Sequence, residues 1–483
     1  MKIKLITLLT ICLLFSAVLN SEAQNKEIIL SVELNGNKTL NISKTPLKYD
    51  KDFAFSFCFD DGLLDSYQLG FRLFNGGTSE VGGLNFPGLY YSDGCGNQIT
   101  FTASIAWFTA NRQGFDIHNG TNTTNMTYSQ AVQLYANGWS FLNHSYDHSD
   151  GNADIDYMDQ LTRNDQIFMS RVGHRLRYVV PPSGDFNYIA PAFDFGAPAV
   201  FTSNAGYSQN NGVPYKVDDI VTTYQPVFWR NGINSDDDNA ESLTKNIKDI
   251  YDETDSGNHL WWNEFTHHIS YERIGGSIEF VEFRKYMENL ANEYGSSGRD
   301  NCLFANSVEV FEYLVVRDYI DISQSRSGRN ATITLDYSSC PDYLRYNDIS
   351  IFLEGESIKS LSISSPASIS YAPHKNGYLV NVSLPSSYFT GISLSPGFNS
   401  NSIEIYPNPA VGHFFVKTNF ILDPDRKARL IDFSGRTHYP DSRIFDQYYC
   451  KIDLDENTFP PGLYIVIIED SKGSFHSKKI ILK

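Results

Sequence analysis

The first residues in the sequence that could do chemistry are two adjacent carboxylates, Asp60 and Asp61, which are followed by Gly62. They come directly after the run Phe53–Phe59, in which bulky and small residues alternate as they do in a β-strand. At the end of a strand, one carboxylate can hold a metal ion while the other faces a substrate. Asp-Asp-Gly is also the composition of an ordinary turn, so the pair alone does not establish a site.

Two histidines four positions apart, His144 and His148, form the second candidate group. This spacing can place both imidazoles on one face of a helical turn, and neutral imidazole is a common ligand of zinc. Together with Asp61 they would make a set of two histidines and one carboxylate that leaves coordination positions open for water. The alternative is that both are surface histidines of a polar loop.

The third candidate group is His267-His268, which follows the apolar run Leu260–Phe265. A histidine at the end of a barrel strand is well placed for proton transfer, whereas the alternative is a half-buried structural histidine. Each group alone has an ordinary explanation. Their order along the chain, carboxylate pair, histidine pair and late histidine, indicates that they share one site.

This order resembles the polysaccharide deacetylase family, also called the NodB-homology or carbohydrate esterase family four domain. The segments Phe59–Gly62 and Gly138–His148 resemble its first two motifs. Pro181–Gly184 resembles the end of its third motif, and Phe265–His267 resembles its fifth, with His268 as the alternative. The resemblance extends over residues 45 to 320.

The resemblance implies a role for each matched residue. One divalent metal ion, with zinc expected, would have three ligands: Asp61, His144 and His148. Asp60 would be the general base, the backbone N–H of Ser183 would help to hold the oxyanion, and His267 would be the acid. The implied reaction is the removal of N- or O-acetyl groups from an acetylated polysaccharide by metal-activated water.

The sequence departs from the family pattern at two places. The third motif normally carries an arginine that orients the base, at the position that Val180 occupies here. The fourth motif, an Asp followed by Trp, has only weak candidates in Asp218-Asp219 and Trp229-Arg230. A base beside a cation needs a partner that fixes its rotamer and pKa. Arg230 is the candidate for that partner, and the alternative is that it is an ordinary surface arginine.

Two other functions remain open at this point. The missing arginine is compatible with a non-catalytic carbohydrate-binding protein on a degenerate deacetylase scaffold. A metal-dependent hydrolase that acts on another amide would use the same residues. The sequence does not choose among chitin, peptidoglycan, O-acetylated xylans and other glycans as substrate.

The elements that must position these residues alternate between strands and helices. Strands are predicted at residues 53–59, 101–108, 139–142, 178–180, 197–201, 226–229 and 260–266. Helices are predicted at residues 127–136, 243–251, 278–294 and 307–317. Strands that alternate with helices predict an α/β fold, here a distorted (β/α) barrel.

Four segments are expected along the chain. Residues 1–24 read as a signal peptide, because Lys2 and Lys4 precede a short apolar core. Residues 25–320 form the catalytic domain, and its first part, residues 25–50, is predicted to be a hairpin. Residues 321–400 are rich in strand-forming runs and predict a small β-sandwich, with the last of these strands at Gly391–Leu394.

The last segment, residues 401–483, begins with Ile405–Ala410 and ends on Lys478–Lys483. With Leu430–Arg436 and Pro461–Val466 between them, these pieces resemble the C-terminal sorting domain of the type IX secretion system. The resemblance implies contact with that secretion machinery, passage through the periplasm, and a secreted or cell-surface location. The barrel is thus expected to be followed by two small all-β sandwich domains. The alternative to a sorting role is a third β-sandwich with a binding role of its own.

Composition limits the partners. The chain of 483 residues has a formal net charge of −18, and it lacks the Lys and Arg patches that nucleic-acid binding needs. No apolar run is long enough for a comfortable membrane span. Five cysteines remain after the signal peptide, without a CxxC pair, so a cysteine zinc site is not expected. One or two disulfides would be compatible with export.

Overall fold

The computed structural model describes most of the chain after the predicted signal peptide. The described residues are 26–151, 154–203, 212–233, 237–252, 258–272, 277–364, 367–384, 403–418, 428–432, 437–446, 449–455, 459–469 and 475–482. The predicted signal peptide and the predicted strand Gly391–Leu394 lie outside them. Among the described helices, none is both long and apolar enough to cross a membrane.

A seven-stranded sheet carries the candidate residues. Its central order is β11-β14-β3-β8-β9, with β13 paired to β14 and β15 paired to β3. The strands are β3 (Phe53–Phe59), β8 (Ser104–Trp107), β9 (Ser140–Asn143), β11 (Tyr215–Lys216), β13 (Asn231–Gly232), β14 (Leu260–Thr266) and β15 (Cys302–Phe304). Only the pairing of β11 with β14 is antiparallel, so the carboxyl ends of the other strands share one edge.

The sheet continues beyond β9 and curves. Val179 bridges in parallel to Asn143 and to Val200, and β10 (Val200–Thr202) pairs in parallel with β12 (Val227–Trp229). The chain then passes from β12 into β13, which pairs with β14 at the other end of the central order. The protein is therefore a mixed α/β protein with a half-barrel sheet, in agreement with the predicted fold class at that level.

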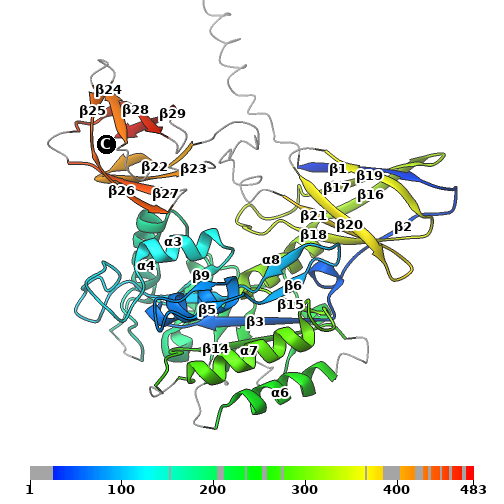
Figure 1. The fold of residues 1–483 in the computed structure, drawn as a ribbon, viewed down its shortest axis with the longest axis horizontal. Coiled ribbons are helices and arrows are strands. Elements are labelled where there is room, and N and C mark those ends of the chain that lie inside the picture. The colour runs from blue at the N-terminus through cyan, green and yellow to red at the C-terminus, as the bar shows by residue number, and fades with distance from the viewer. Residues whose placement is uncertain are drawn as a thin grey trace, which may run out of the picture. The chain divides into compact units, whose positions relative to one another are not determined.

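The alternation in β3 has the predicted structural effect. Its phenylalanines pack against α7 (Phe280–Tyr294), with Phe57 5.2 Å from Phe283 between ring centroids. Figure 1 shows α7 running beside β3 and β14. The smaller Ser56 points to the other face, where its hydroxyl accepts a hydrogen bond from Trp261 Nε1 at 3.0 Å. Burial of each phenylalanine contributes about 1.5–3 kcal/mol to the stability of the fold. The end of β3, which Asp60 directly follows, is therefore firmly held.

Helices follow the strands as predicted. The described helices are α2 (Arg72–Asn75), α3 (Tyr128–Ala136), α4 (Tyr157–Val172), α5 (Ile189–Asp194), α6 (Ala240–Asp252), α7 and α8 (Ser307–Tyr319). At the start of α3, Thr127 and Gln130 form a capping box, in which each side chain binds the other residue's backbone N–H. Two short hairpins lie between α2 and β8, β4 (Gly77–Thr78) with β5 (Asn85–Phe86) and β6 (Tyr90–Ser92) with β7 (Gln98–Thr100).

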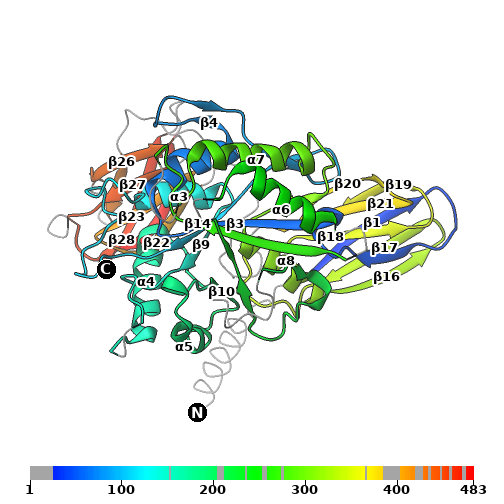
Figure 2. The ribbon, with the colours of Figure 1, turned by 90° about the horizontal axis from the view of Figure 1, so that it is seen from below.

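A second compact unit contains two four-stranded antiparallel sheets. One has the order β16 (Asp321–Ser327), β17 (Asn330–Asp336), β1 (Glu27–Leu34), β19 (Ile358–Ile363). The other has the order β2 (Asn41–Lys44), β18 (Ile349–Glu354), β21 (Gly377–Ser383), β20 (Ser368–His374). Both appear in Figure 2 as the sheets labelled β1 and β18.

The predicted hairpin in residues 25–50 is wrong, because β1 and β2 belong to different sheets. Strand β1 buries every second residue, and it pairs with β17 from Glu27↔Asp336 to Glu33↔Asn330. Its other edge pairs with β19. These two long-range partners satisfy both edges of β1, so the N-terminal strands group with residues 312–384 and not with the α/β unit.

The C-terminal strands form an eight-stranded sheet with the order β25-β24-β28-β29-β22-β23-β27-β26. Their bounds are β22 (Ile403–Val411), β23 (His413–Thr418), β24 (Arg429–Asp432), β25 (Thr437–His438), β26 (Asp441–Asp446), β27 (Tyr449–Asp453), β28 (Gly462–Glu469) and β29 (Phe475–Leu482). Side chains such as Phe414, Ile452 and Val466 form its buried core.

Candidate metal centre and active site

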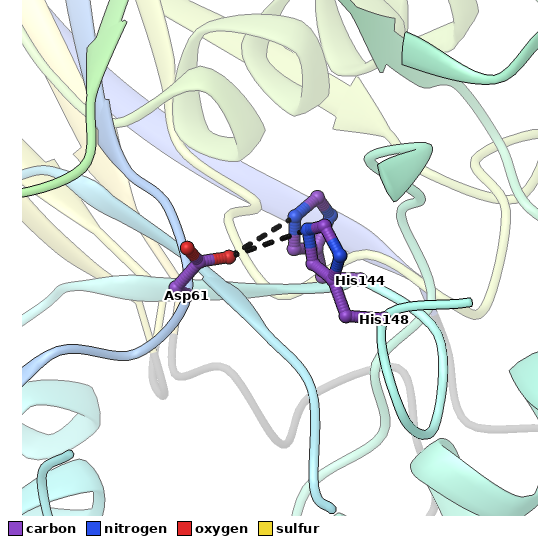
Figure 3. A group of neighbouring side chains, drawn as sticks. All are labelled: Asp61, His144 and His148. Atoms are coloured by element: carbon purple, nitrogen blue, oxygen red, sulfur yellow. Dashed lines mark ion pairs between the residues drawn. The ribbon is translucent and has the colours of Figure 1, made fainter. Parts of the chain in front are cut away.

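Three predicted ligands meet at the carboxyl edge of the α/β sheet, as Figure 3 shows. Asp61 follows β3, and the two histidines follow β9. Asp61 Oδ1 lies 3.5 Å from His144 Nε2 and 3.6 Å from His148 Nε2. The three ligand atoms lie within 4.8 Å of one another, and Asp61 Oδ1 is buried without a hydrogen-bond partner. A buried carboxylate oxygen that faces two imidazole nitrogens fits a divalent cation.

The orientation of His144 is fixed by the backbone. Its Nδ1 lies 2.7 Å from the carbonyl oxygen of Val180, which can only accept, so Nδ1 carries a proton. Nε2 is therefore the atom that faces Asp61 and can bind a metal. Val180 thus takes part in the site through its main chain, at the position where the resembling family has an arginine.

Asp61 and His144 shift each other's pKa. Burial opposes ionisation of Asp61, but the neighbouring His144 and His148 outweigh it and lower the pKa of Asp61 to about 2. Burial likewise opposes protonation of His144, whereas the carboxylates of Asp61 and Asp60 raise the pKa of His144 above its usual value. Metal ligands must be deprotonated, so a cation at this position would compete with a proton on His144.

The backbone at the ligands is unusual. Asp61, Ser145 and His148 have positive φ angles of 71°, 64° and 56°. Such angles are uncommon for residues with a Cβ, and they often occur at functional sites, where the surrounding structure holds them. The expected helical turn between the two histidines is wrong, because residues 144–148 form an irregular bend. This bend still brings the two rings within 4.8 Å between centroids.

An amide network that the sequence did not reveal supports this bend. The buried Asn164 of α4 donates to Asn143 Oδ1 at 2.8 Å and to the carbonyl oxygen of Trp107 at 2.7 Å. Asn143 Oδ1 also accepts the Ser145 N–H at 3.2 Å, and Thr109 donates to Asn164 Oδ1 at 2.8 Å. In the sequence, the signal that could have revealed this network is Asn164, a polar residue among the apolar positions of a helix.

Arg230, the candidate partner of the base, lies beside Asp60. It is the single residue between β12 and β13, and its Nη1 and Nη2 bind Asp60 Oδ1 and Oδ2 at 2.7 and 3.0 Å. Both side chains are buried, at 2% and 4% exposure, so Arg230 is not a surface arginine. Burial favours the neutral acid, but the Arg230 guanidinium outweighs it and holds the pKa of Asp60 below its usual value.

The alternative fourth-motif candidate does not join this pair. Asp218 and Asp219 are exposed in the short helix Val217–Asp219. Phe265 instead packs its ring against the Arg230 guanidinium, 4.4 Å from the ring centroid, which favours the cation.

The two late histidines take different positions. The pairing of β14 with β3 ends at Thr266 opposite Phe59, so His267 and Asp60 are the next residues along the two strands. Its charge acts on both Asp60 and Asp61. His268 instead places Nδ1 2.9 Å from Asp65 Oδ2, which also accepts the Ile269 N–H at 3.1 Å.

Ser183 lies on a neighbouring loop, in the turn Pro182–Gly184, with a positive φ of 52°. Its side chain lowers the pKa of Asp150, and Arg112 acts in the same direction. Arg112 donates to Asp150 at 2.7 Å and to the His148 carbonyl oxygen at 3.4 Å. These contacts connect the Ser183 loop to the second histidine ligand.

The C-terminal sheet matches a known family in sequence. Residues 404–483 match the family model described as the secretion system C-terminal sorting domain. The chain carries a type IX secretion C-terminal sorting domain. The predicted sorting domain is thereby confirmed, and it indicates that the protein is secreted or placed on the cell surface.

Solved structures resemble the chain only distantly. A deacetylase of Streptococcus pyogenes, PplD in complex with acetate, is 12% identical, with 48% of this chain and 85% of that chain covered and a TM-score of 0.25. The peptidoglycan deacetylase PdaC from Bacillus subtilis is 11% identical, with 55% and 92% covered and a TM-score of 0.28. A CE4 family pseudoenzyme from Bacillus anthracis is 13% identical, with 54% and 66% covered and a TM-score of 0.28.

No curated protein sequence matches the chain.

Proposed function

We propose that the protein is an exported, metal-dependent deacetylase that hydrolyses acetyl groups on a polysaccharide. The observation that carries the proposal is the buried ion pair of Asp60 and Arg230 beside the convergent ligands Asp61, His144 and His148. A carboxylate that is held rigidly next to a cation site, at the end of a strand, suits a general base for hydrolysis.

The ligand set fits one divalent ion, and zinc is the ion expected for two imidazoles and a carboxylate. When bound by Asp61, His144 and His148, such an ion would supply Lewis-acid polarisation of the acetyl carbonyl and a lower pKa for water. The buried, unpartnered Oδ1 of Asp61 is the observation that supports this occupancy.

The chain's own residues divide the remaining work. Asp60 takes a proton from the attacking water as the water oxygen bonds to the carbonyl carbon. The Ser183 N–H donates to the oxyanion that forms. His267 gives a proton to the leaving amine nitrogen or alkoxide oxygen as the bond from that atom to the carbonyl carbon breaks, and acetate is released. His267 acts electrostatically on Asp60 and Asp61, whereas His268 is paired with Asp65, which favours His267 for this step.

The proposal includes the finer architecture. The pairings that run from β14 through β3, β8 and β9 to β10 and β12, and return through β13 to β14, support a distorted (β/α) barrel. The two four-stranded sheets and the sorting domain would be the two small β-sandwich domains.

The alternative of a non-catalytic carbohydrate-binding protein was based on the absence of an arginine at the position of Val180. Arg230 supplies a guanidinium to Asp60 from another strand, so that reason no longer applies. A hydrolase for another amide would use the same residues, and only the substrate distinguishes it.

The test is acetate release by the purified protein from a panel of acetylated glycans, with and without a chelator. The panel includes chitin oligomers, peptidoglycan and O-acetylated xylan. We expect release from at least one glycan, loss on chelation and recovery when zinc is added. Zinc-loaded protein that binds a glycan but releases no acetate would support the non-catalytic alternative and refute the proposal.

A further inference from the structure

Cys58 lies directly beneath the base. It is two residues before Asp60 on β3, so both side chains point to the same face of the sheet. Its Sγ is 3.3 Å from Asp60 Oδ1, and the thiol is 1% exposed. The guanidinium of Arg230 also acts on this sulfur, so the three side chains form one buried group.

The single proton of the thiol has two acceptors within reach, Asp60 Oδ1 at 3.3 Å and the carbonyl oxygen of Phe59 at 3.9 Å. The carboxylate oxygen is nearer and charged, so it is the stronger acceptor. Burial, together with the charge of Asp60, raises the pKa of Cys58 well above its usual value, so the sulfur keeps its proton. Asp60 Oδ1 therefore receives two donors, Arg230 Nη1 at 2.7 Å and the Cys58 S–H. Asp60 Oδ2 receives one, Arg230 Nη2 at 3.0 Å.

This difference distinguishes the two oxygens of the base. A carboxylate oxygen has two lone pairs that accept hydrogen bonds. On Oδ1 both are in use, whereas on Oδ2 one remains for another partner. Rotation of the carboxylate, which would exchange the two oxygens, would break both bonds from Arg230 and the bond from Cys58.

We propose that Cys58 is a positioning residue for the general base: with Arg230 it occupies both lone pairs of Asp60 Oδ1 and leaves Oδ2 as the oxygen that takes the proton from water. The proposal rests on the function proposed above. In this arrangement Asp60 Oδ2 is the atom that accepts the proton, and the buried thiol of Cys58 has a role although it does not itself react.

The first test compares three variants in the metal-loaded protein. Cys58→Ala frees one lone pair of Asp60 Oδ1. We expect kcat to fall about ten-fold, because one hydrogen bond to a charged group is lost, and KM to stay unchanged. Cys58→Ser keeps a donor at this position and should recover most of the loss. The matched control is Cys302→Ala, because Cys302 is equally buried but lies opposite Phe53, at the far end of β3.

The outcomes separate this proposal from the proposed function. If the wild-type protein releases acetate but Cys58→Ala behaves as Cys302→Ala does, the role of Cys58 is wrong and the proposed function stands. If Cys58→Ser is as impaired as Cys58→Ala, the thiol acts through packing alone and the proposal is also wrong. If the wild-type protein releases no acetate, the proposed function has failed.

A second test needs no activity. The S–H stretching band of Cys58 can be assigned in the infrared spectrum as the band that Cys58→Ser removes and Cys302→Ala does not. Because an amide accepts a weaker hydrogen bond than a carboxylate, this band should move to higher frequency in Asp60→Asn. An unshifted band would mean that the thiol does not donate to Asp60, and it would overturn the proposal.

Discussion

Arg230 binds both carboxylate oxygens of Asp60, at 2.7 and 3.0 Å, although 170 residues separate the two along the chain. Arg230 lies between the short strands β12 and β13, and Asp60 directly follows β3. A bidentate arginine fixes a carboxylate more firmly than a point charge can, because its planar fork matches the two oxygens. Asp60, the proposed base, is therefore held by a segment other than the one that carries Val180.

The first prediction concerns this pair. Arg230→Lys keeps the charge but loses the fork, so we expect turnover to fall about 10- to 100-fold, which corresponds to about 1.4–2.7 kcal/mol. Metal content, measured by elemental analysis, should not change, because Arg230 contacts none of the three ligands. Wild-type turnover in Arg230→Lys and in Arg230→Gln would show that the pair does not serve catalysis.

The second prediction concerns the metal. We expect one divalent ion per chain, and we expect His144→Ala to lose it because one of three protein ligands is removed. His174→Ala is the control, since His174 stacks on Tyr135 and is not a ligand. Elemental analysis after dialysis decides the matter, and equal metal content in both variants would refute the assigned site.

The third prediction separates the base from the ligands. Asp60→Asn should keep the metal and lose about 10²–10⁴-fold in turnover, because the amide cannot accept the proton. It is measured as acetate release under saturating zinc, beside metal content in the same sample. Near-full turnover in Asp60→Asn would exclude Asp60 as the base.

The fourth prediction concerns export. Deletion of residues 403–483 should leave the protein folded but retained in the periplasm, because the sorting domain at 404–483 is removed. Fractionation with an antibody against the α/β unit measures the distribution. Normal amounts of the truncated protein at the surface or in the medium would contradict the role of this domain.

Local sequence patterns predicted the residues of the candidate site better than they predicted which strands belong to which compact unit. Strand β3, the capped helix α3 and the three proposed metal ligands each have a short-range signal, and the need for a partner of Asp60 led to Arg230. The pairing of Glu27 with Asp336 has no local signal, since β1 alternates as any half-buried strand does. The positive φ at Ser145 and His148 was equally hidden, because such angles are uncommon in every residue type but glycine, and the enrichment of histidine among the exceptions does not mark a position.

The last prediction concerns Glu264, a carboxyl that is buried between β14 and α7. Trp262 Nε1 lies 2.8 Å from Glu264 Oε1, and the Tyr286 hydroxyl lies 2.9 Å from Oε2. Burial raises the pKa of Glu264 from 4.5 to about 7, although both hydrogen bonds act in the opposite direction. The folded protein therefore binds one more proton than the unfolded chain between these two pH values.

The sign of the pH effect follows from that proton. The stabilising contribution of the neutral carboxyl is complete below pH 4.5 and is lost as the pH rises to about 7, a change of about 3 kcal/mol. Glu264→Gln should remove this dependence, because the amide is neutral throughout, whereas the exposed control Glu241→Gln should keep it. Urea unfolding followed by tryptophan fluorescence measures it, since all five tryptophans lie in the α/β unit. If Glu264→Gln loses stability between pH 4.5 and 7 as steeply as Glu241→Gln does, Glu264 does not carry the proton.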